Sequence, residues 1–122
     1  MSLRWLLLLA ILLGTGCGGN SLPTAADPAR ARDSLTTVLD AWQGGANSDS
    51  LQSRTPAIHV NDPAWSSGKK LVKYEIKSEE AAGQSWRCEV ELTVKNGDGA
   101  ETKQHALYCI DTDPALVIVR EP

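Results

Sequence analysis

The chain lacks an apolar segment long enough to cross a membrane as a helix. Its longest apolar run, from Trp5 to Leu13, has nine residues, whereas a membrane-spanning helix needs roughly 20. The run follows one basic residue, Arg4, and ends among small residues, which is typical of a secretory signal peptide. We therefore expect residues 1–16 to be a signal peptide and exclude them from the fold prediction.

Motifs that would indicate an enzyme or a metal site are also missing. The chain has no Gly-x-Ser-x-Gly nucleophile elbow and no glycine-rich phosphate loop. Its two histidines, His59 and His105, are too few for a zinc site, which takes about four nitrogen or sulfur ligands. Residues 96–101, NGDGAE, place several oxygen ligands close together but lack the spacing of a calcium-binding EF-hand and suit a hairpin turn. We expect a non-catalytic protein with no metal and no cofactor.

The chain has fewer basic than acidic residues. The chain has 12 Lys and Arg against 15 Asp and Glu, a formal net charge of −3, and loss of the signal peptide with its Arg4 leaves 11 against 15, or −4. Proteins that bind nucleic acid carry clustered Lys and Arg. The nearest such cluster, Lys69, Lys70 and Lys73, is diluted by the glutamates that follow it. We therefore expect no nucleic acid partner.

Cysteine is rare, and one of the three cysteines, Cys17, ends the signal region. The stretch resembles the lipobox of bacterial lipoproteins, in which small residues precede a cysteine that receives diacylglycerol. Thr15, Gly16 and Cys17 match that pattern, while Gly14 stands where a leucine is usual. The resemblance implies a lipid on Cys17. The alternative is ordinary signal-peptidase cleavage, which would release a secreted protein.

The residues after Cys17 favour the lipid anchor. Residues 18–26, GGNSLPTAA, are mostly glycine, alanine and small polar residues with one proline, a composition typical of a flexible tether. The remaining residues 27–122 have the size of a single domain. We expect a membrane-anchored lipoprotein of the cell envelope that faces the periplasm or the exterior, with its domain held near the membrane.

The two other cysteines, Cys88 and Cys109, are expected to form a disulfide because export would place them in an oxidising compartment. A two-residue turn at residues 98–99 would set them opposite each other, about 4.5 Å apart between Cα atoms. A turn at residues 96–97 would instead set Cys88 opposite His105. We favour the register with the turn at residues 98–99 because it places apolar residues together on one face. If no disulfide forms, the two cysteines would be buried free thiols.

The strongest local pattern predicts a helix over residues 28–43. Asp27 can cap its first turn, Pro28 suits the first helical position, and Gly44 and Gly45 can end it. Apolar residues recur at helical spacing and form a single stripe, made of Ala31, Leu35, Val38, Leu39 and Trp42. Because one helix cannot bury this stripe alone, we expect a sheet to cover it.

The rest of the domain shows the alternation of half-buried strands. Strands are expected near residues 58–60, 72–76, 86–95, 101–110 and 115–119, after one short helical turn near residues 48–53. The last of them is apolar on both faces, which favours a central position. Short links make neighbouring strands antiparallel, and the absence of Phe indicates a modest core. The expected fold class is α+β, an N-terminal helix packed on a curved antiparallel sheet of four or five strands.

This order of elements resembles cystatin-like and nuclear-transport-factor-2-like α+β folds. Some enzymes of the second superfamily use a pocket aspartate or histidine with a tyrosine, and the candidates here are Asp40, Tyr74 and Tyr108. No motif aligns them with a family base, and a fold does not imply a function. We expect a binding or accessory module of unknown specificity. The resemblance adds one alternative, a small-molecule pocket protein or enzyme.

We expect specific contacts along residues 61–75. This segment combines an Asp-Pro turn with Trp65, outside any periodic element, and with Lys69, Lys70 and Tyr74. Tryptophan is common at interaction hot spots, but a tryptophan between elements more often closes the open end of a core. The expected partner is an envelope protein, or less favourably a small ligand.

Overall fold

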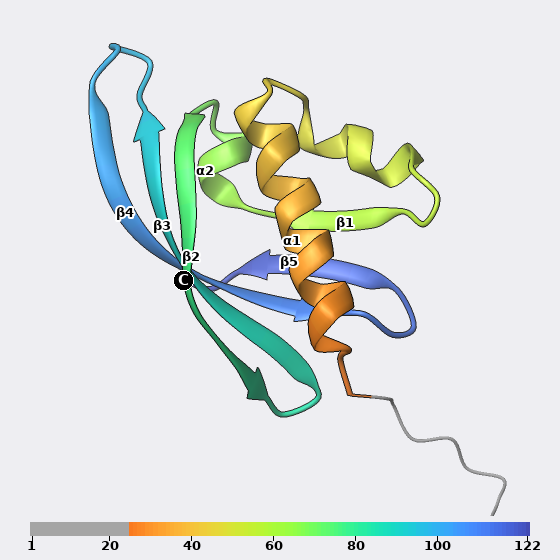
Figure 1. The fold of residues 1–122 in the computed structure, drawn as a ribbon. Coiled ribbons are helices and arrows are strands. Elements are labelled where there is room, and N and C mark those ends of the chain that lie inside the picture. Colours follow the sequence, from red (N-terminus) through yellow and green to blue (C-terminus); the bar gives the residue numbers. More distant parts are fainter. Residues whose placement is uncertain (1–24) are drawn as a thin grey trace, which may run out of the picture.

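The computed structural model describes residues 25–122. They form an α+β domain in which one long helix packs on a five-stranded sheet (Figure 1). Predictions that concern residues 1–24, including the signal peptide and Cys17, lie outside the described residues. Within the described part, no helix is long and apolar enough to cross a membrane. The elements in chain order are α1 (Pro28–Gln43), η3 (Ser48–Ser53), β1 (Ile58–Asn61), α2 (Pro63–Ser66), β2 (Lys70–Ala82), β3 (Ser85–Lys95), β4 (Glu101–Asp111) and β5 (Leu116–Arg120).

Helix α1 has the bounds that its sequence predicts. The Asp27 side chain accepts a hydrogen bond from the Ala29 N–H at 3.1 Å, and the Gly44 N–H donates to the Asp40 carbonyl at 2.9 Å. Gly45 follows with a φ of +88°, which a glycine adopts without strain. The predicted apolar stripe is buried, namely Ala31, Leu35, Val38, Leu39 and Trp42.

The sheet has the strand order β1-β5-β4-β3-β2. Strands β2 to β5 pair in antiparallel fashion as predicted, whereas β1 pairs with β5 in parallel. The prediction of a wholly antiparallel sheet is therefore wrong at one edge. Its basis was the short links between consecutive strands, but β1 and β2 lie at opposite edges, and α2 stands between them in the chain. Strand β5 lies inside the sheet, which explains why it is apolar on both faces.

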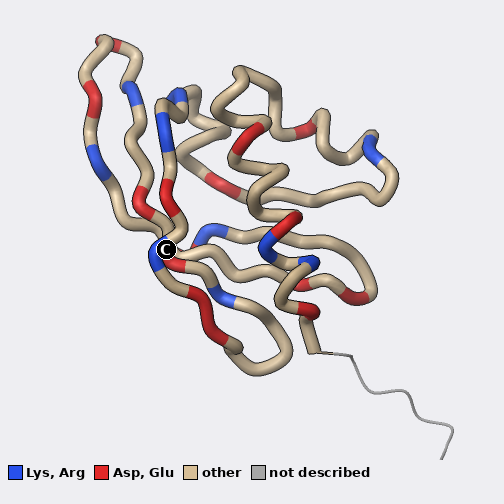
Figure 2. The backbone as a smooth tube through the Cα atoms, in the orientation of Figure 1, with Lys and Arg blue, Asp and Glu red and all other residues tan. Residues whose placement is uncertain are grey.

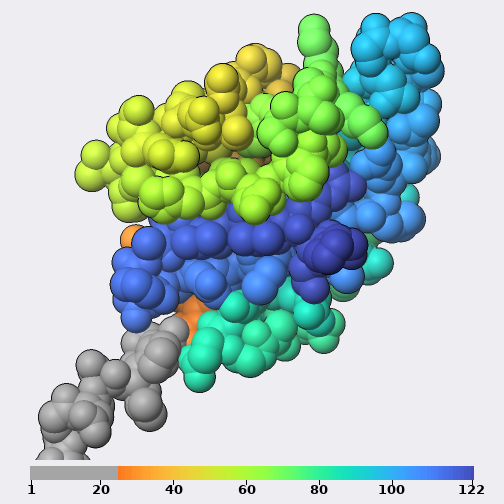
Figure 3. All heavy atoms as spheres, turned by 180° about the vertical axis from the view of Figure 1, so that it is seen from behind, coloured from red at the N-terminus to blue at the C-terminus, as the bar shows by residue number. Residues whose placement is uncertain are grey.

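One face of the sheet and α1 enclose the core. Alternate residues of β3 and β4 point into it, and Leu51 of η3 closes one side. In β2 the alternation is broken, because its register against β3 shifts twice, between Leu71 and Lys73 and between Ile76 and Ser78. Charges of both signs are spread along the strands (Figure 2). Figure 3 shows the side of the domain turned away from α1, where β1 lies beside β5.

The hairpin between β3 and β4 has a longer turn than either turn that we considered. The Asn96 N–H donates to the Ala100 carbonyl at 2.9 Å, so that three residues, 97–99, form the tip. The last of them, Gly99, has a φ of +88°. An odd number of turn residues moves the pairing by one residue relative to a two-residue turn, and such a slip puts each side chain on the other face.

The predicted disulfide is wrong for this reason. Cys88 lies opposite Tyr108, and Cys109 lies opposite Arg87, so the two sulfur atoms are on opposite faces of the sheet. Both cysteines are free thiols. Cys88 is fully buried in the core, whereas Cys109 is partly exposed on the outer face.

The two thiols should therefore react very differently. Burial raises the pKa of Cys88 to about 12, and the thiolate is the reactive form. In the Cys17→Ser chain at pH 8, we expect an alkylating reagent to add one label to the folded protein and a second only in urea, as read by mass spectrometry. Cys109→Ser should remove the first label. Two labels before unfolding would contradict the register in which Cys88 faces the core.

Candidate functional site

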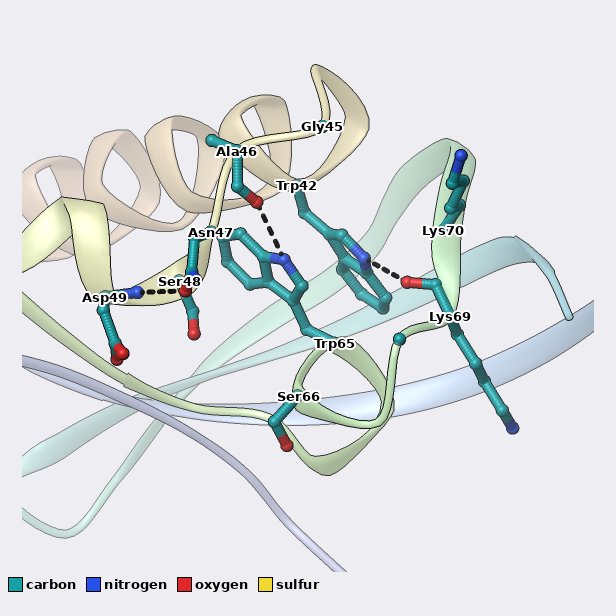
Figure 4. Close-up of a pocket in the computed structure, with 11 residues that line it drawn as sticks. Trp42, Gly45, Ala46, Asn47, Ser48, Asp49, Trp65, Ser66, Lys69 and Lys70 are labelled. Carbon is teal, nitrogen blue, oxygen red and sulfur yellow. Dashed lines mark hydrogen bonds between the residues drawn. The ribbon is translucent and has the colours of Figure 1, made fainter. Parts of the chain in front are cut away.

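The segment singled out from the sequence, residues 61–75, passes the C-terminal end of α1 and borders two surface pockets. The first pocket has a volume of about 540 Å³ and lies between residues 45–49 and residues 65–70 (Figure 4). Gly68, with a φ of +98°, turns the chain from α2 into β2. The tight turn brings the lysines that follow it to the pocket rim.

Two stacked tryptophans form the floor of this pocket. The rings of Trp42 and Trp65 lie 5.6 Å apart between centroids, with 14° between their planes. Trp42 Nε1 donates to the Lys69 carbonyl at 2.8 Å, and Trp65 Nε1 donates to the Ala46 carbonyl at 3.1 Å. Trp65 lies in α2 and not in a loop, and only 8% of it is exposed. It thus closes the end of the core, and the alternative of an exposed anchor does not hold.

The lysines of the segment take different positions around the pocket. Lys69 is partly buried and Lys70 is exposed, and both line the pocket. Figure 4 shows their side chains pointing in different directions, with Asp49 on the far rim. Because Trp42 and Trp65 are only 3% and 8% exposed, the pocket offers little indole surface, and its wall is made mainly of backbone and small polar groups with two lysines at the rim. This combination suits the binding of a partner's acidic and apolar groups.

Tyr74 lies apart from the other three predicted contact residues. Its hydroxyl donates to Asp40 Oδ1 at 2.7 Å, which joins β2 to α1. Partial burial raises the pKa of Tyr74 to about 12, and the Asp40 carboxylate adds to this effect. The tyrosine is therefore a weaker acid than usual, and the pair fastens the helix to the sheet.

A buried polar cluster lies on the other side of α2. The Tyr108 hydroxyl donates to Asp62 Oδ2 at 2.5 Å, and Arg120 Nη1 donates to Asp62 Oδ1 at 3.2 Å. Burial raises the pKa of Tyr108 above its ordinary range, and the negative charge of Asp62 raises it further. A tyrosine with a raised pKa adds stability below about pH 10, and this contribution is lost as the pH rises through the raised pKa.

Sequence reasoning missed Asp62 and Arg120. A signal for Asp62 was present, since Asp before Pro is typical of a helix start, and it was interpreted as a turn. Arg120 follows an apolar strand and carries no signal of its own. Among the described residues, no group of three or more His, Cys, Asp or Glu lies close enough to hold a metal ion.

Comparison of the chain with protein-family models, curated proteins and solved structures finds no match.

Proposed function

We propose that this protein is a non-catalytic lipoprotein of the cell envelope, anchored through a lipid on Cys17, and that its domain binds an envelope protein. One observation carries the proposed binding role, namely the position of the first pocket at the end of α1 opposite to the point where the chain enters the domain. A pocket so placed would lie at the end of the domain farther from the anchoring point, where other proteins can reach it.

The entry point is fixed by two hydrogen bonds. The Ala26 N–H donates to the Gln84 carbonyl at 2.8 Å, and the Asp27 N–H donates to Thr112 Oγ1 at 3.0 Å. Helix α1 (Figure 1) then runs for 16 residues, or about 24 Å, and Trp42 lies in its last turn. The eight residues 18–25 between Cys17 and this entry point allow a separation of at most about 28 Å. The pocket would thus stand well clear of the lipid surface.

The expected likeness to cystatin-like and nuclear-transport-factor-2-like folds, with a curved sheet behind an N-terminal helix, belongs to the same proposal. An enzyme of the second type would need a hollow between helix and sheet. That space is occupied here by buried core side chains, among them Leu35, Leu39 and Leu92, and the Tyr74 and Asp40 pair is used to join α1 to β2. These contacts favour a binding module over a pocket enzyme.

Cross-linking from the pocket rim tests the proposal. A photo-reactive residue in place of Lys70, in the native cells, should give a discrete adduct of higher mass. The same residue in place of the exposed Gln84, at the entry end of the domain, should give none. After two-phase detergent extraction the adduct should enter the detergent phase, and Cys17→Ser should move the chain to the aqueous phase.

Each part of the proposal can fail separately. Equal adducts from the two positions, or none, would contradict a binding role for the first pocket. A wild-type chain already in the aqueous phase would contradict the lipid anchor and leave the secreted alternative.

A further inference from the structure

A second pocket lies on the other side of α2, with a volume of about 740 Å³. Residues from β1, α2, β4 and β5 line it, among them Gln104 and Arg120, together with Lys69 from the link between α2 and β2. We propose that this pocket binds the phosphate group of a small phosphorylated molecule through Arg120 and Lys69. Its volume is in the usual range for small-ligand sites.

The guanidinium of Arg120 is held in place by the protein before any ligand binds. Nη1 donates to Asp62 Oδ1 at 3.2 Å, and Nη2 donates to Gln104 Oε1 at 2.8 Å. The Arg120 side chain is 15% exposed. Since a guanidinium carries five N–H donors, these two bonds leave donors for a ligand. A fixed planar fork of this kind matches the geometry of phosphate oxygens.

The support behind Arg120 is buried. The Asp62 side chain is only 2% exposed, and it also accepts from the Tyr108 hydroxyl at 2.5 Å and from the Ala64 N–H at 3.0 Å. A buried ion pair adds little net stability, because desolvation of the two charges opposes their attraction. A buried carboxylate that orients an arginine at a pocket wall is the arrangement expected when that arginine serves a ligand.

The charges around this pocket favour an anion. Lys69, from the link between α2 and β2, and Arg120, from β5, bring two cations to the lining. The one acidic side chain in the lining, Glu121, is bound at both oxygens by Arg87, at 2.7 and 3.2 Å. Arg120 is likewise paired with Asp62, so Lys69 supplies the positive charge that these pairs leave over in the lining. This charge and the remaining guanidinium donors of Arg120 suit a doubly charged phosphate better than a singly charged carboxylate.

The lining also supplies an uncharged donor and apolar surface. The Asn61 amide lies in the lining, while Leu107 and Pro63 add apolar surface. The Ser67 hydroxyl also lines the pocket but donates its proton to the Ala64 carbonyl at 3.0 Å. Phosphate esters carry an organic group next to the charged oxygens, so a pocket with both kinds of surface fits an ester. The site is independent of the first pocket except that Lys69 lines both.

Titration of the full chain with Cys17→Ser tests the site, with amide NMR shifts as the readout. We expect saturable binding of sn-glycerol 3-phosphate and of inorganic phosphate at millimolar concentration, with shifts confined to residues 61–69, 104–107 and 119–121. Acetate should bind at least tenfold more weakly. Vesicles of phosphatidylglycerol and of phosphatidylcholine distinguish the source of the phosphate. If the chain binds phosphatidylglycerol vesicles more tightly, the ligand is a lipid headgroup; if it binds both kinds of vesicle equally, the ligand is a soluble phosphate ester.

Two neighbouring lysines provide a matched pair of variants. Lys69→Gln should weaken phosphate binding about tenfold, whereas Lys70→Gln, which alters only the first pocket, should change it less than twofold. Arg120→Lys should abolish phosphate binding. Because this substitution also disturbs the contacts of Asp62, Lys69→Gln provides the test if the Arg120→Lys chain does not fold. Absence of saturable shifts at 50 mM phosphate, equal effects of the two lysine variants, or acetate binding as strong as phosphate would each overturn the proposal.

Discussion

Asp62→Ala is expected to lower the free energy of unfolding by about 3–5 kcal/mol, the usual range for breaking a buried ion pair by removing one partner. The carboxylate has three partners in the fold, which are the Tyr108 hydroxyl, Arg120 Nη1 and the Ala64 N–H. Its loss would leave a fully buried hydroxyl and a largely buried guanidinium without their acceptor, and α2 without its cap. An alanine methyl group can replace none of these contacts.

Urea unfolding at pH 7, followed by circular dichroism, measures this change. Asp49→Ala is the matched control, since Asp49 is an exposed aspartate and should shift the free energy by less than about 0.5 kcal/mol. Asp62→Asn keeps the shape of the side chain and loses its charge, so it should fall between the two. A loss below 1 kcal/mol for Asp62→Ala would contradict the role of this carboxylate as the centre of the cluster.

The features predicted correctly from the sequence are those that depend on near neighbours. Helix α1 follows from a cap, a proline, an apolar stripe and two glycines within residues 27–45, and the long strands follow from simple alternation. Helix α2 escaped notice because its four residues are too few to show a period. Its only sequence signal was the pair Asp62 and Pro63.

The features predicted wrongly depend on contacts between distant segments or on one residue in a turn. The parallel pairing of β1 with β5 joins segments more than 50 residues apart, and no local pattern encodes it. The disulfide failed because a three-residue tip replaced a two-residue turn and moved Cys88 and Cys109 to opposite faces. The Asp62 cluster joins side chains 46 and 58 positions apart, so it becomes visible only in the folded chain.

Trp42→Ala should destabilise the domain by a comparable amount, about 3–5 kcal/mol for the truncation of a buried tryptophan. The ring is 3% exposed and stacks on Trp65, and aromatic pairs of this kind add about 0.5–1.5 kcal/mol beyond area burial. The variant would also remove the hydrogen bond from Nε1 to the Lys69 carbonyl, which fixes the turn that leads into β2. Both the core and the first pocket depend on this side chain.

A second substitution separates the ring from its N–H group. Trp42→Phe keeps an aromatic ring against Trp65 but cannot donate to the Lys69 carbonyl, so it should lose less stability than Trp42→Ala, yet still loosen the pocket rim. Urea unfolding gives the order of the three chains, and near-ultraviolet circular dichroism reports the loss of the stacked pair. Cross-linking from position 70 should weaken in both variants at a temperature where each remains folded. If Trp42→Ala unfolded at the same urea concentration as the wild type, the tryptophan pair would not be the support that joins the end of α1 to β2.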